Sequence, residues 1–486
     1  MKVAFISCSN ESLGIEYLSA YLKQQGHKTR VFIDPQLFND EHLDVPLAAK
    51  IFSYQKNLVK KVIDYNPDLI GFSVVSDFYH WACDLAREFK KHLNVPIIFG
   101  GIHASSVPEE VIKNKFVDMV CIGEGEEALA EVVNRLENRQ NPVDVLNVWA
   151  KKDGNIIKNK LRPLINDLDH IPYPDKKIYY DTSFHFQIGY YTIASRGCLY
   201  TCTYCHHSFL RTIYPHSDYY RVRSVGNIIE ELSINFDKKK HKVIRFSDDI
   251  FPFKEEWLKE FADKFKARIN APFICYIHPD TINPENIDLL KKSGCVEVQL
   301  GIQTLYEQTQ KKILNRNISQ KRWQEVFLLL YNANIKITAE NILGIPNQEI
   351  CEIEDLIRFY CYNKADRIQV FWLKFYPKTK IKEFINQIDK NTQVDNSNKE
   401  KTFTQGGDIF TKELAKLRII FCLLHFLPPK VIEWLLANKR YQSCFLIPLW
   451  ILNLISNFTS KVASDKITRK REWMKYLIFV QRRFIR

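Results

Sequence analysis

The chain alternates short apolar runs with segments of helical periodicity, and this rhythm restricts its fold more than any other feature of the sequence. The first part has apolar runs at 3–6, 69–75, 97–100 and 117–122, separated by helical patterns at 14–25, 51–65, 81–93 and 126–136. Continuous apolar runs are typical of parallel strands that are buried on both faces. Residues 1–140 are therefore predicted to form a doubly wound (Rossmann-like) α/β domain.

The same rhythm returns after a connector at 141–185, which contains Ile171-Pro-Tyr-Pro174 and a short strand at 155–160. Strands are predicted at 191–195, 243–247, 273–277, 296–300, 336–342 and 368–373. Helices are predicted between them at 224–236, 255–268, 284–293, 320–332 and 351–362. Six consecutive βα units predict an open, partial (β/α)6 barrel of the TIM type over 186–385, with its site at the C-terminal ends of the strands. Residues 386–486 are predicted to form a helical C-terminal region.

Composition agrees with a globular protein, since 46% of the 486 residues are hydrophobic and 26% are charged. The first residues show no secretory signal, so we expect a cytoplasmic protein. The chain has twelve cysteines, of which only three are closely clustered. This distribution favours free thiols and one metal site over disulfides.

The three clustered cysteines are Cys198, Cys202 and Cys205, which follow the first predicted strand of the barrel. Three thiolates can hold three irons of a [4Fe–4S] cluster and leave the fourth iron open, whereas clusters that only carry electrons usually have four cysteines. Gly197 permits a sharp turn out of the strand. A zinc site is the alternative, with His206 or His207 as the fourth ligand.

The triplet resembles the C-x3-C-x-aromatic-C signature of the radical S-adenosylmethionine (SAM) superfamily, with Tyr204 as the aromatic residue near adenine. The resemblance implies that the cluster cleaves SAM. It also implies SAM contacts from Asp248 and Asp249, from Gln299 and Gln303, and from Gly344 and Pro346. Asp248 or Asp249 could instead cap a helix, and the glutamines could be polar groups of the barrel interior. Asn347-Gln348-Glu349 departs from the usual continuation of the Gly-x-Pro loop.

The N-terminal domain has candidate ligand loops after its strands, although a flavodoxin-like domain that binds another ligand, or none, fits equally well. The loops resemble those of cobalamin-binding domains within the radical SAM superfamily. This resemblance implies cobalamin contacts from Asn10, Leu13, Gly14, Ser73, Val75, Gly100, Gly101, Gly123 and Glu124. Ser9 and Glu11 stand where the family has Asp and His, so cobalt is expected to lack a histidine ligand on its lower face. For His103 we favour a supporting role over cobalt ligation.

Together these resemblances imply a cobalamin-dependent radical SAM enzyme that generates a 5′-deoxyadenosyl radical. Its simplest activity is methylation of an unactivated carbon in a small or lipid-like metabolite. The alternatives are a non-methylating cyclase or rearrangement enzyme and a cobalamin- or redox-sensing binding protein. A reductase, flavodoxin or ferredoxin is the expected electron donor, and no nucleic-acid partner is expected.

The C-terminal region is apolar at 419–427 and 444–455, and nine Lys or Arg stand against two acids in 461–486. One interpretation makes these helices a cover for the barrel mouth. The alternative uses Trp450, Trp473 and the basic end as a peripheral contact with the inner face of the membrane, without a spanning helix.

Overall fold

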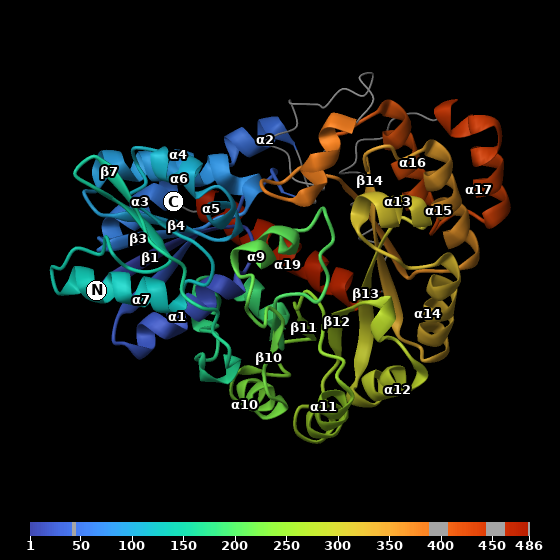
Figure 1. Ribbon diagram of the computed structural model, residues 1–486, viewed down its shortest axis with the longest axis horizontal. Helices are drawn as coiled ribbons and strands as arrows, with labels where there is room; N and C mark the ends of the chain where they lie inside the picture. The colour runs from blue at the N-terminus through green and yellow to red at the C-terminus, as the bar shows by residue number, and fades with distance from the viewer. Residues whose placement is uncertain (41–44, 388–406, 444–461, 485–486) are drawn as a thin grey trace.

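The computed structural model describes residues 1–40, 45–387, 407–443 and 462–484, and it contains two main sheets (Figure 1). The N-terminal sheet has the order β2-β1-β3-β4-β5-β6-β7, in which the first five strands run parallel and β6 and β7 pair antiparallel. Its strands are β1 (Lys2–Cys8), β2 (Lys28–Asp34), β3 (Leu69–Ser73), β4 (Ile97–Gly100), β5 (Met119–Cys121), β6 (Val148–Lys152) and β7 (Asn155–Lys158).

Helices cover both faces of this sheet, as expected for strands that are apolar on both sides. They are α1 (Leu13–Gln24), α2 (Pro46–Ile51), α3 (Gln55–Tyr65), α4 (Tyr79–His92), α5 (Ile102–Ser106), α6 (Pro108–Lys113) and α7 (Glu126–Glu137). One core packs α3 and α4 against the sheet, and a second core packs α1 and α7 against the other face. The doubly wound prediction is confirmed.

Three local predictions differ from the structure. The edge strand β2 was not predicted, because only its last four residues are buried. The strand β6 was also not predicted, since it lies in the segment treated as a connector. The helix predicted over 51–65 begins only at Gln55, as α3, because the chain leaves helical geometry after Ile51, the last residue of α2.

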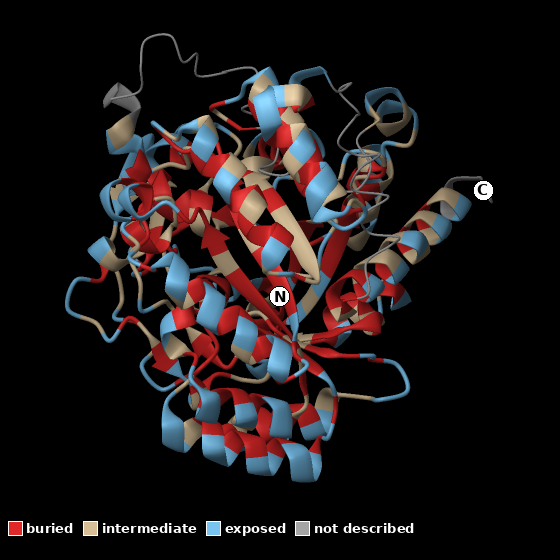
Figure 2. Cartoon of the chain, turned by 90° about the vertical axis from the view of Figure 1, so that its right-hand side faces the viewer, coloured by how far each residue is buried: buried red, intermediate tan, exposed pale blue. Residues whose placement is uncertain are grey.

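The second sheet has six parallel strands in the order β15-β14-β13-β12-β11-β8 and does not close on itself. Its strands are β8 (Tyr190–Thr192), β11 (Ile244–Phe246), β12 (Phe273–Ile277), β13 (Cys295–Gln303), β14 (Lys336–Leu343) and β15 (Arg367–Trp372). The outer helices are α10 (Val225–Asn235), α11 (Glu255–Arg268), α12 (Pro284–Ser293), α14 (Gln320–Asn332) and α15 (Ile350–Tyr362). Their buried faces point towards the strands (Figure 2), which confirms the partial barrel.

The strand predicted over 191–195 is divided in two. Its first part is β8, and its end forms β9 (Ser195–Arg196), which pairs antiparallel with β10 (Arg221–Val222) outside the main sheet. The cysteine triplet follows β9 directly. The chain therefore leaves the parallel sheet one short strand before the triplet.

The C-terminal helices α16 (Lys412–Leu423) and α17 (Pro429–Leu436) pack against α15 on the outside of the barrel. The apolar run at 419–427 overlaps α16, where Ile419, Ile420 and Phe421 are buried. The run at 444–455, with Trp450, lies outside the described residues. None of the helices in the described ranges is both long and apolar enough to span a bilayer.

The last helix, α19 (Ala463–Phe484), lies across the open side of the barrel and continues to the N-terminal sheet (Figure 1). Asp465 pairs with Arg367 of β15, while the Arg471 guanidinium lies 4.8 Å from the ring centroid of Tyr191 in β8. Near the far end of the helix, Phe479 enters the core beside α3 and α4. One helix therefore contacts both edge strands of the barrel and the other sheet.

Candidate functional site

Gly197 makes the turn that carries the chain from β9 into the cysteine triplet. Its φ is +84°, and a Cβ atom there would lie 2.0 Å from the carbonyl oxygen of Tyr219. Both facts exclude a side chain, because residues other than glycine rarely adopt this φ and the neighbour is backbone. The glycine predicted to permit the sharp turn is therefore required by the geometry.

The three cysteines line one cavity of about 440 Å³ at the C-terminal ends of the barrel strands, called here the cysteine cavity. Burial raises the pKa of Cys198 to about 11 and that of Cys205 to about 12. These thiols are therefore protonated at neutral pH until a cation stabilises their thiolates. Three thiols on one loop that faces an open cavity fit a cluster with one exposed iron.

The segment that follows β13 holds the cysteine loop through hydrogen bonds. The Thr203 amide donates to the carbonyl of Leu314 at 3.1 Å, and the Asn315 side chain donates to the Thr201 carbonyl at 3.2 Å. Arg316, which the sequence analysis did not single out, lies 3.7 Å from Cys202 Sγ and donates to the Tyr204 hydroxyl at 3.3 Å. Its buried positive charge stands beside the predicted cluster thiolates and the predicted adenine contact.

His207 has partners that oppose the zinc alternative. Its Nδ1 lies 2.7 Å from the Tyr219 hydroxyl and its Nε2 lies 2.9 Å from the Asp249 carboxylate. Zinc binding through either nitrogen would break one of these contacts. Burial lowers the pKa of His206 to about 4, so this side chain is neutral, and its Nδ1 lies 4.0 Å from Cys205 Sγ. The ligand atoms of His206, His207 and Asp249 lie within 4.8 Å of one another.

Five of the predicted SAM contacts also line the cysteine cavity, namely Tyr204, Asp248, Asp249, Gln299 and Gln303. Two others, Gly344 and Pro346, do not line it. They flank Ile345, which is buried in a small apolar cluster against which Tyr204 packs. That these seven residues contact SAM stays a prediction. His278 was not predicted, yet its ring stacks on Tyr200 at 3.7 Å in the wall of the cavity.

Asp248 does not cap the following helix, contrary to one alternative. Its Oδ1 accepts hydrogen bonds from the Ala194 amide at 2.9 Å and the Ser195 hydroxyl at 2.5 Å. Its Oδ2 is buried and has no hydrogen-bond partner among the described residues. Burial raises the pKa of this carboxyl to about 7, despite the two hydrogen bonds. One oxygen thus fixes the side chain, and the other is available to a cationic ligand group.

A second cavity, of about 310 Å³, lies at the C-terminal ends of strands β1, β3, β4 and β5 and is called the glycine cavity. Seven of the predicted cobalamin contacts line it, namely Leu13, Gly14, Ser73, Gly100, Gly101, Gly123 and Glu124. A Cβ atom on Gly101, whose φ is +89°, would lie 2.7 Å from the Val74 amide nitrogen. Glycine therefore opens this edge of the sheet to a large ligand.

The other two predicted cobalamin contacts lie elsewhere. Val75 lines neither of these cavities, and its side chain is 46% exposed. Asn10 lines a third cavity of about 400 Å³ between the N-terminal sheet, the barrel and α19, called the junction cavity. Ser9 and Glu11 line the same cavity. The loop after β1 therefore faces the barrel.

The two acidic candidates of this region are held by ion pairs. Glu124 pairs with Arg196 at 3.2 Å and with Arg221 at 2.9 Å, which keeps the pKa of its carboxyl low although burial alone would raise it. Glu11 pairs with Lys176 at 3.1 Å and with Arg471 at 3.9 Å. Glu11 stands at the position where related domains have histidine, and its carboxylate forms structural ion pairs there.

His103 begins the first turn of α5, and its Nδ1 lies 2.9 Å from the Ser76 hydroxyl. Burial lowers the pKa of this imidazole to about 4, so it is neutral. Its Nε2 is buried without a hydrogen-bond partner among the described residues. The supporting role that the sequence analysis favoured over cobalt ligation stays a prediction.

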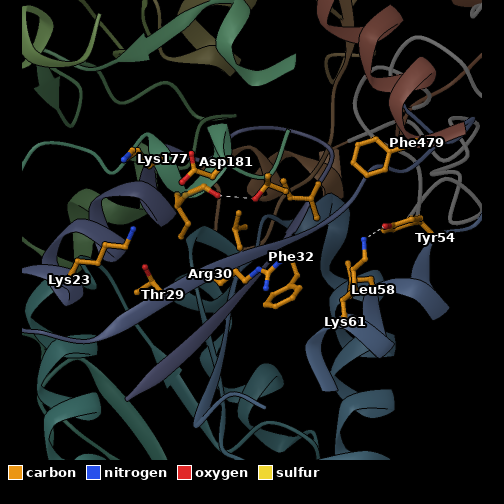
Figure 3. Close-up of a pocket in the computed structure, with 14 residues that line it drawn as sticks. Lys23, Thr29, Arg30, Phe32, Tyr54, Leu58, Lys61, Lys177, Asp181 and Phe479 are labelled. Atoms are coloured by element: carbon orange, nitrogen blue, oxygen red, sulfur yellow. Dashed lines mark hydrogen bonds between the residues drawn. The ribbon is translucent and has the colours of Figure 1, made fainter. Parts of the chain in front are cut away.

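A cavity of about 580 Å³ lies along the edge strand β2, and Figure 3 shows its lining. Lys23, Arg30, Lys61 and Lys177 gather around it with the aromatic rings of Phe32 and Phe479. None of the predicted site residues lines this groove. It is therefore separate from the chemistry suggested by the cysteines.

Two protein-family models match the chain, and they coincide with the two sheets. The model of the radical SAM superfamily matches residues 192–360, and the model of the B12 binding domain matches residues 9–133. This chain combines a B12 binding domain with a radical SAM domain. The predicted cofactors, a [4Fe–4S] cluster, SAM and cobalamin, are confirmed by this combination of domains.

Several known proteins are similar to this chain over most of its length. An uncharacterized methyltransferase of Pyrococcus horikoshii is 24% identical over 88% of this chain and 90% of that protein. Cytidylyl-2-hydroxyethylphosphonate methyltransferase of Streptomyces wedmorensis is 23% identical over 69% of each chain. The radical SAM methyltransferase TsrM of Kitasatospora setae, solved with cobalamin and a [4Fe–4S] cluster, superposes with a TM-score of 0.64 at 13% identity. The superposition covers 81% of this chain and 80% of that one, so the fold is shared.

Proposed function

We propose that this chain is a cobalamin-dependent radical SAM enzyme that methylates an unactivated carbon of a small molecule. The observation that carries the proposal is the adjacency of the cavities, because the cysteine cavity and the junction cavity share Arg245 and Ser247 in their walls. A substrate at this point is within reach of both halves of the protein. The relatives from Pyrococcus horikoshii and Streptomyces wedmorensis are both named methyltransferases, which supports the same reaction class.

When bound, the cluster and SAM supply a 5′-deoxyadenosyl radical, and cobalamin supplies a methyl group. The residues of this chain position and shield these groups. Cys198, Cys202 and Cys205 hold the cluster, while the free Oδ2 of Asp248 is placed to accept from the SAM ammonium. Arg316 stabilises negative charge at Cys202.

Anaerobic reconstitution of the full chain tests the proposal. We expect about four irons per chain by the stoichiometry of the cluster, a cobalamin absorption spectrum, and formation of 5′-deoxyadenosine when dithionite supplies electrons. Replacing Cys198, Cys202 and Cys205 together by alanine should abolish both iron binding and SAM cleavage. Cys351→Ala is a matched control, because this thiol is exposed and outside the site. Unaltered SAM cleavage in the triple variant would refute the proposal, and a reconstituted wild-type protein that cleaves no SAM would favour the sensing protein.

A second candidate is a cyclase or rearrangement enzyme with the same cofactors. An anaerobic magnesium-protoporphyrin IX monomethyl ester cyclase of Synechocystis is 28% identical over 30% of this chain and 31% of that protein. Incubation of the reconstituted enzyme with methyl-labelled SAM separates the two. Label on the bound cobalamin supports methyl transfer, whereas SAM cleavage without labelled cobalamin supports the cyclase.

We also propose that the protein is cytoplasmic and that a flavodoxin or ferredoxin donates its electrons. A further proposal is a lipid contact through the exposed face of α19. Trp473 and Leu477 are 56% and 55% exposed on this helix, which supports a contact with lipid. Two of its basic residues do not contribute, since Arg471 and Lys475 are paired with Glu11 and Asp40. Flotation with anionic liposomes tests the contact. It should be weakened in a Trp473→Ala, Leu477→Ala double variant, and a wild-type protein that stays at the bottom would contradict it.

A further inference from the structure

Arg245 occupies the point where the cysteine cavity meets the junction cavity. It lies on β11, three residues before Asp248, and it is one of only two described residues that line both spaces. The other is Ser247. A molecule that extends from one cavity into the other must therefore pass the Arg245 side chain.

Arg245 has no close ion-pair partner among the described residues, although the Glu297 and Glu340 carboxylates act on its charge from farther away. Its Nη2 donates to the Tyr276 hydroxyl and to the Gln299 side-chain oxygen, both at 2.8 Å, and both partners are uncharged. Among residues 1–40, 45–387, 407–443 and 462–484, no carboxylate lies within 4 Å of the guanidinium. Its Nε and Nη1 donate no hydrogen bond to these residues. A half-buried guanidinium without a close counter-ion favours a ligand that supplies one.

The acids of the junction cavity do not serve as this counter-ion, because other cations hold them. Glu11 pairs with Lys176 at 3.1 Å, Asp40 pairs with Lys475 at 2.8 Å, and Glu472 pairs with the same lysine at 2.5 Å. The acids of the junction cavity are therefore paired within the protein, and Arg245 is left facing the cavity without one of them as its counter-ion.

Glu340 faces the cysteine cavity from β14, on the other side of β12 and β13. Across the described part of the chain, its carboxyl has no hydrogen bond and no ion pair. Burial raises its pKa, although the nearby Arg245 and Arg367 act in the opposite direction. Arg245 and Glu340 thus present one donor and one acceptor to the same space without meeting each other.

We propose that the substrate of this enzyme carries an anionic group, either a carboxylate or a phosphonate or phosphate, which Arg245 binds where the cavities meet. Glu340 accepts a hydrogen bond from a hydroxyl or ammonium group of the same molecule. Guanidinium groups bind such anions through paired, charge-assisted hydrogen bonds. This inference rests on the proposed function and names its substrate class. It opposes a purely hydrocarbon substrate, which would leave Arg245 without a close counter-ion.

Isothermal titration of the holoenzyme tests this assignment with three small probes: propionate, methylphosphonate and the neutral propionamide. Cluster, cobalamin and SAM are present, and reductant is left out so that SAM is not consumed. We expect at least one anion to bind at least tenfold more tightly than propionamide. The tighter of the two anions then separates a carboxylate substrate from a phosphonate or phosphate substrate.

Variants of Arg245 assign the binding to this side chain. Arg245→Gln should weaken anion binding at least tenfold, and Arg245→Lys should weaken it less, because lysine keeps the charge but loses the paired geometry. Arg268→Gln is the matched control, since Arg268 is exposed at the end of α11. Iron and cobalamin contents are measured for each variant, and the lysine variant gives a second result if the glutamine variant folds poorly.

Two results would overturn the inference. Equal binding of propionamide and both anions to the wild-type holoenzyme would show that the junction does not select anions. A loss of SAM affinity in Arg245→Gln as large as its loss of anion affinity would assign Arg245 to the carboxylate of SAM. A wild-type protein that binds neither iron nor cobalamin would instead refute the proposed function itself.

Discussion

The guanidinium of Arg196 lies 2.6 Å from the Glu126 carboxylate and 3.2 Å from that of Glu124. Arg196 ends β9 and directly precedes Gly197, while both glutamates belong to the loop and helix that follow β5. Arg196, two residues before Cys198, is therefore tied to the edge of the N-terminal sheet. The position of the triplet depends on contacts with both domains.

The variant Arg196→Gln tests whether these ion pairs position the triplet. Removing one partner of a buried ion pair leaves the other charge uncompensated, and we expect a loss of about 3 kcal/mol of stability together with reduced iron content. Thermal unfolding and iron analysis measure the two effects. Arg135→Gln is the control, because its partners Glu131 and Asp144 are more exposed and such pairs contribute less than about 1 kcal/mol. Equal losses in the two variants would contradict the prediction.

Gly197→Ala should disrupt the cysteine loop, because the added Cβ would collide with the Tyr219 carbonyl. The expected result is at least a halving of the iron bound after reconstitution, with a clear fall in melting temperature. Gly154→Ala is a close control, since its φ is +81° but nothing lies within 4 Å of the added atom. The control should show only the backbone strain of about 1 kcal/mol. Full iron loading of Gly197→Ala would show that the loop tolerates a side chain.

Asp248→Asn should stabilise the SAM-free protein in a pH-dependent way. The folded-state pKa of Asp248 is about 7, above the value of about 3.9 in unfolded chains, so its burial destabilises the ionised form. This cost appears as pH rises from about 4 to about 7 and is then constant. The variant keeps an oxygen acceptor for Ala194 and Ser195, so its advantage should grow from near zero at pH 4 towards about 4 kcal/mol at pH 8.

Chemical denaturation at several pH values measures the effect of Asp248→Asn on stability. The variant Asp249→Asn should change stability in the opposite direction. Burial acts to raise the pKa of Asp249, but the hydrogen bond and charge of His207 outweigh it and the net pKa is lowered. The Asp249→Asn variant should therefore lose stability at neutral pH. A pH-independent difference between wild type and Asp248→Asn would be evidence against a buried, strained carboxyl.

Ile467→Ala tests how α19 closes the barrel. Ile467 is 7% exposed and packs against Ile188, Val243 and Ile274 at the base of the strands. The cavity left by the substitution should cost about 2–4 kcal/mol, measured by denaturant unfolding. Leu477→Ala on the same helix is 55% exposed and should change stability by less than about 0.5 kcal/mol. A similar small effect at both positions would indicate that α19 does not support the barrel.

Local sequence patterns predicted much of the fold and the cysteine site. The buried parallel strands have long apolar runs, and the cysteine triplet has a fixed spacing that resembles a known signature. The edge strand β2 escaped prediction because Lys28, Thr29 and Arg30 are not buried and hide its strand pattern. The break between α2 and α3 has no proline or glycine to mark it.

Other parts of the site depend on contacts between distant segments, which sequence patterns do not record. Arg316 contacts Cys202, which is 114 residues away in the sequence, and Arg471 of the C-terminal helix contacts Glu11. The positive charge of the C-terminal region suggested a lipid surface, whereas part of it neutralises acids at the junction cavity. Arg245 and Glu340 occupy strand positions with no motif, so only the cavity that they share indicates a role.

The helix α19 also sets the order in which the site can be assembled during synthesis. Both sheets leave the ribosome before residues 463–484, so the barrel stays open on one side and the junction cavity lacks one wall until this segment emerges. Large cofactors can enter most easily during that interval, before the helix packs across the opening. The timing of translation relative to cofactor supply should therefore influence how much of this protein matures into a loaded enzyme.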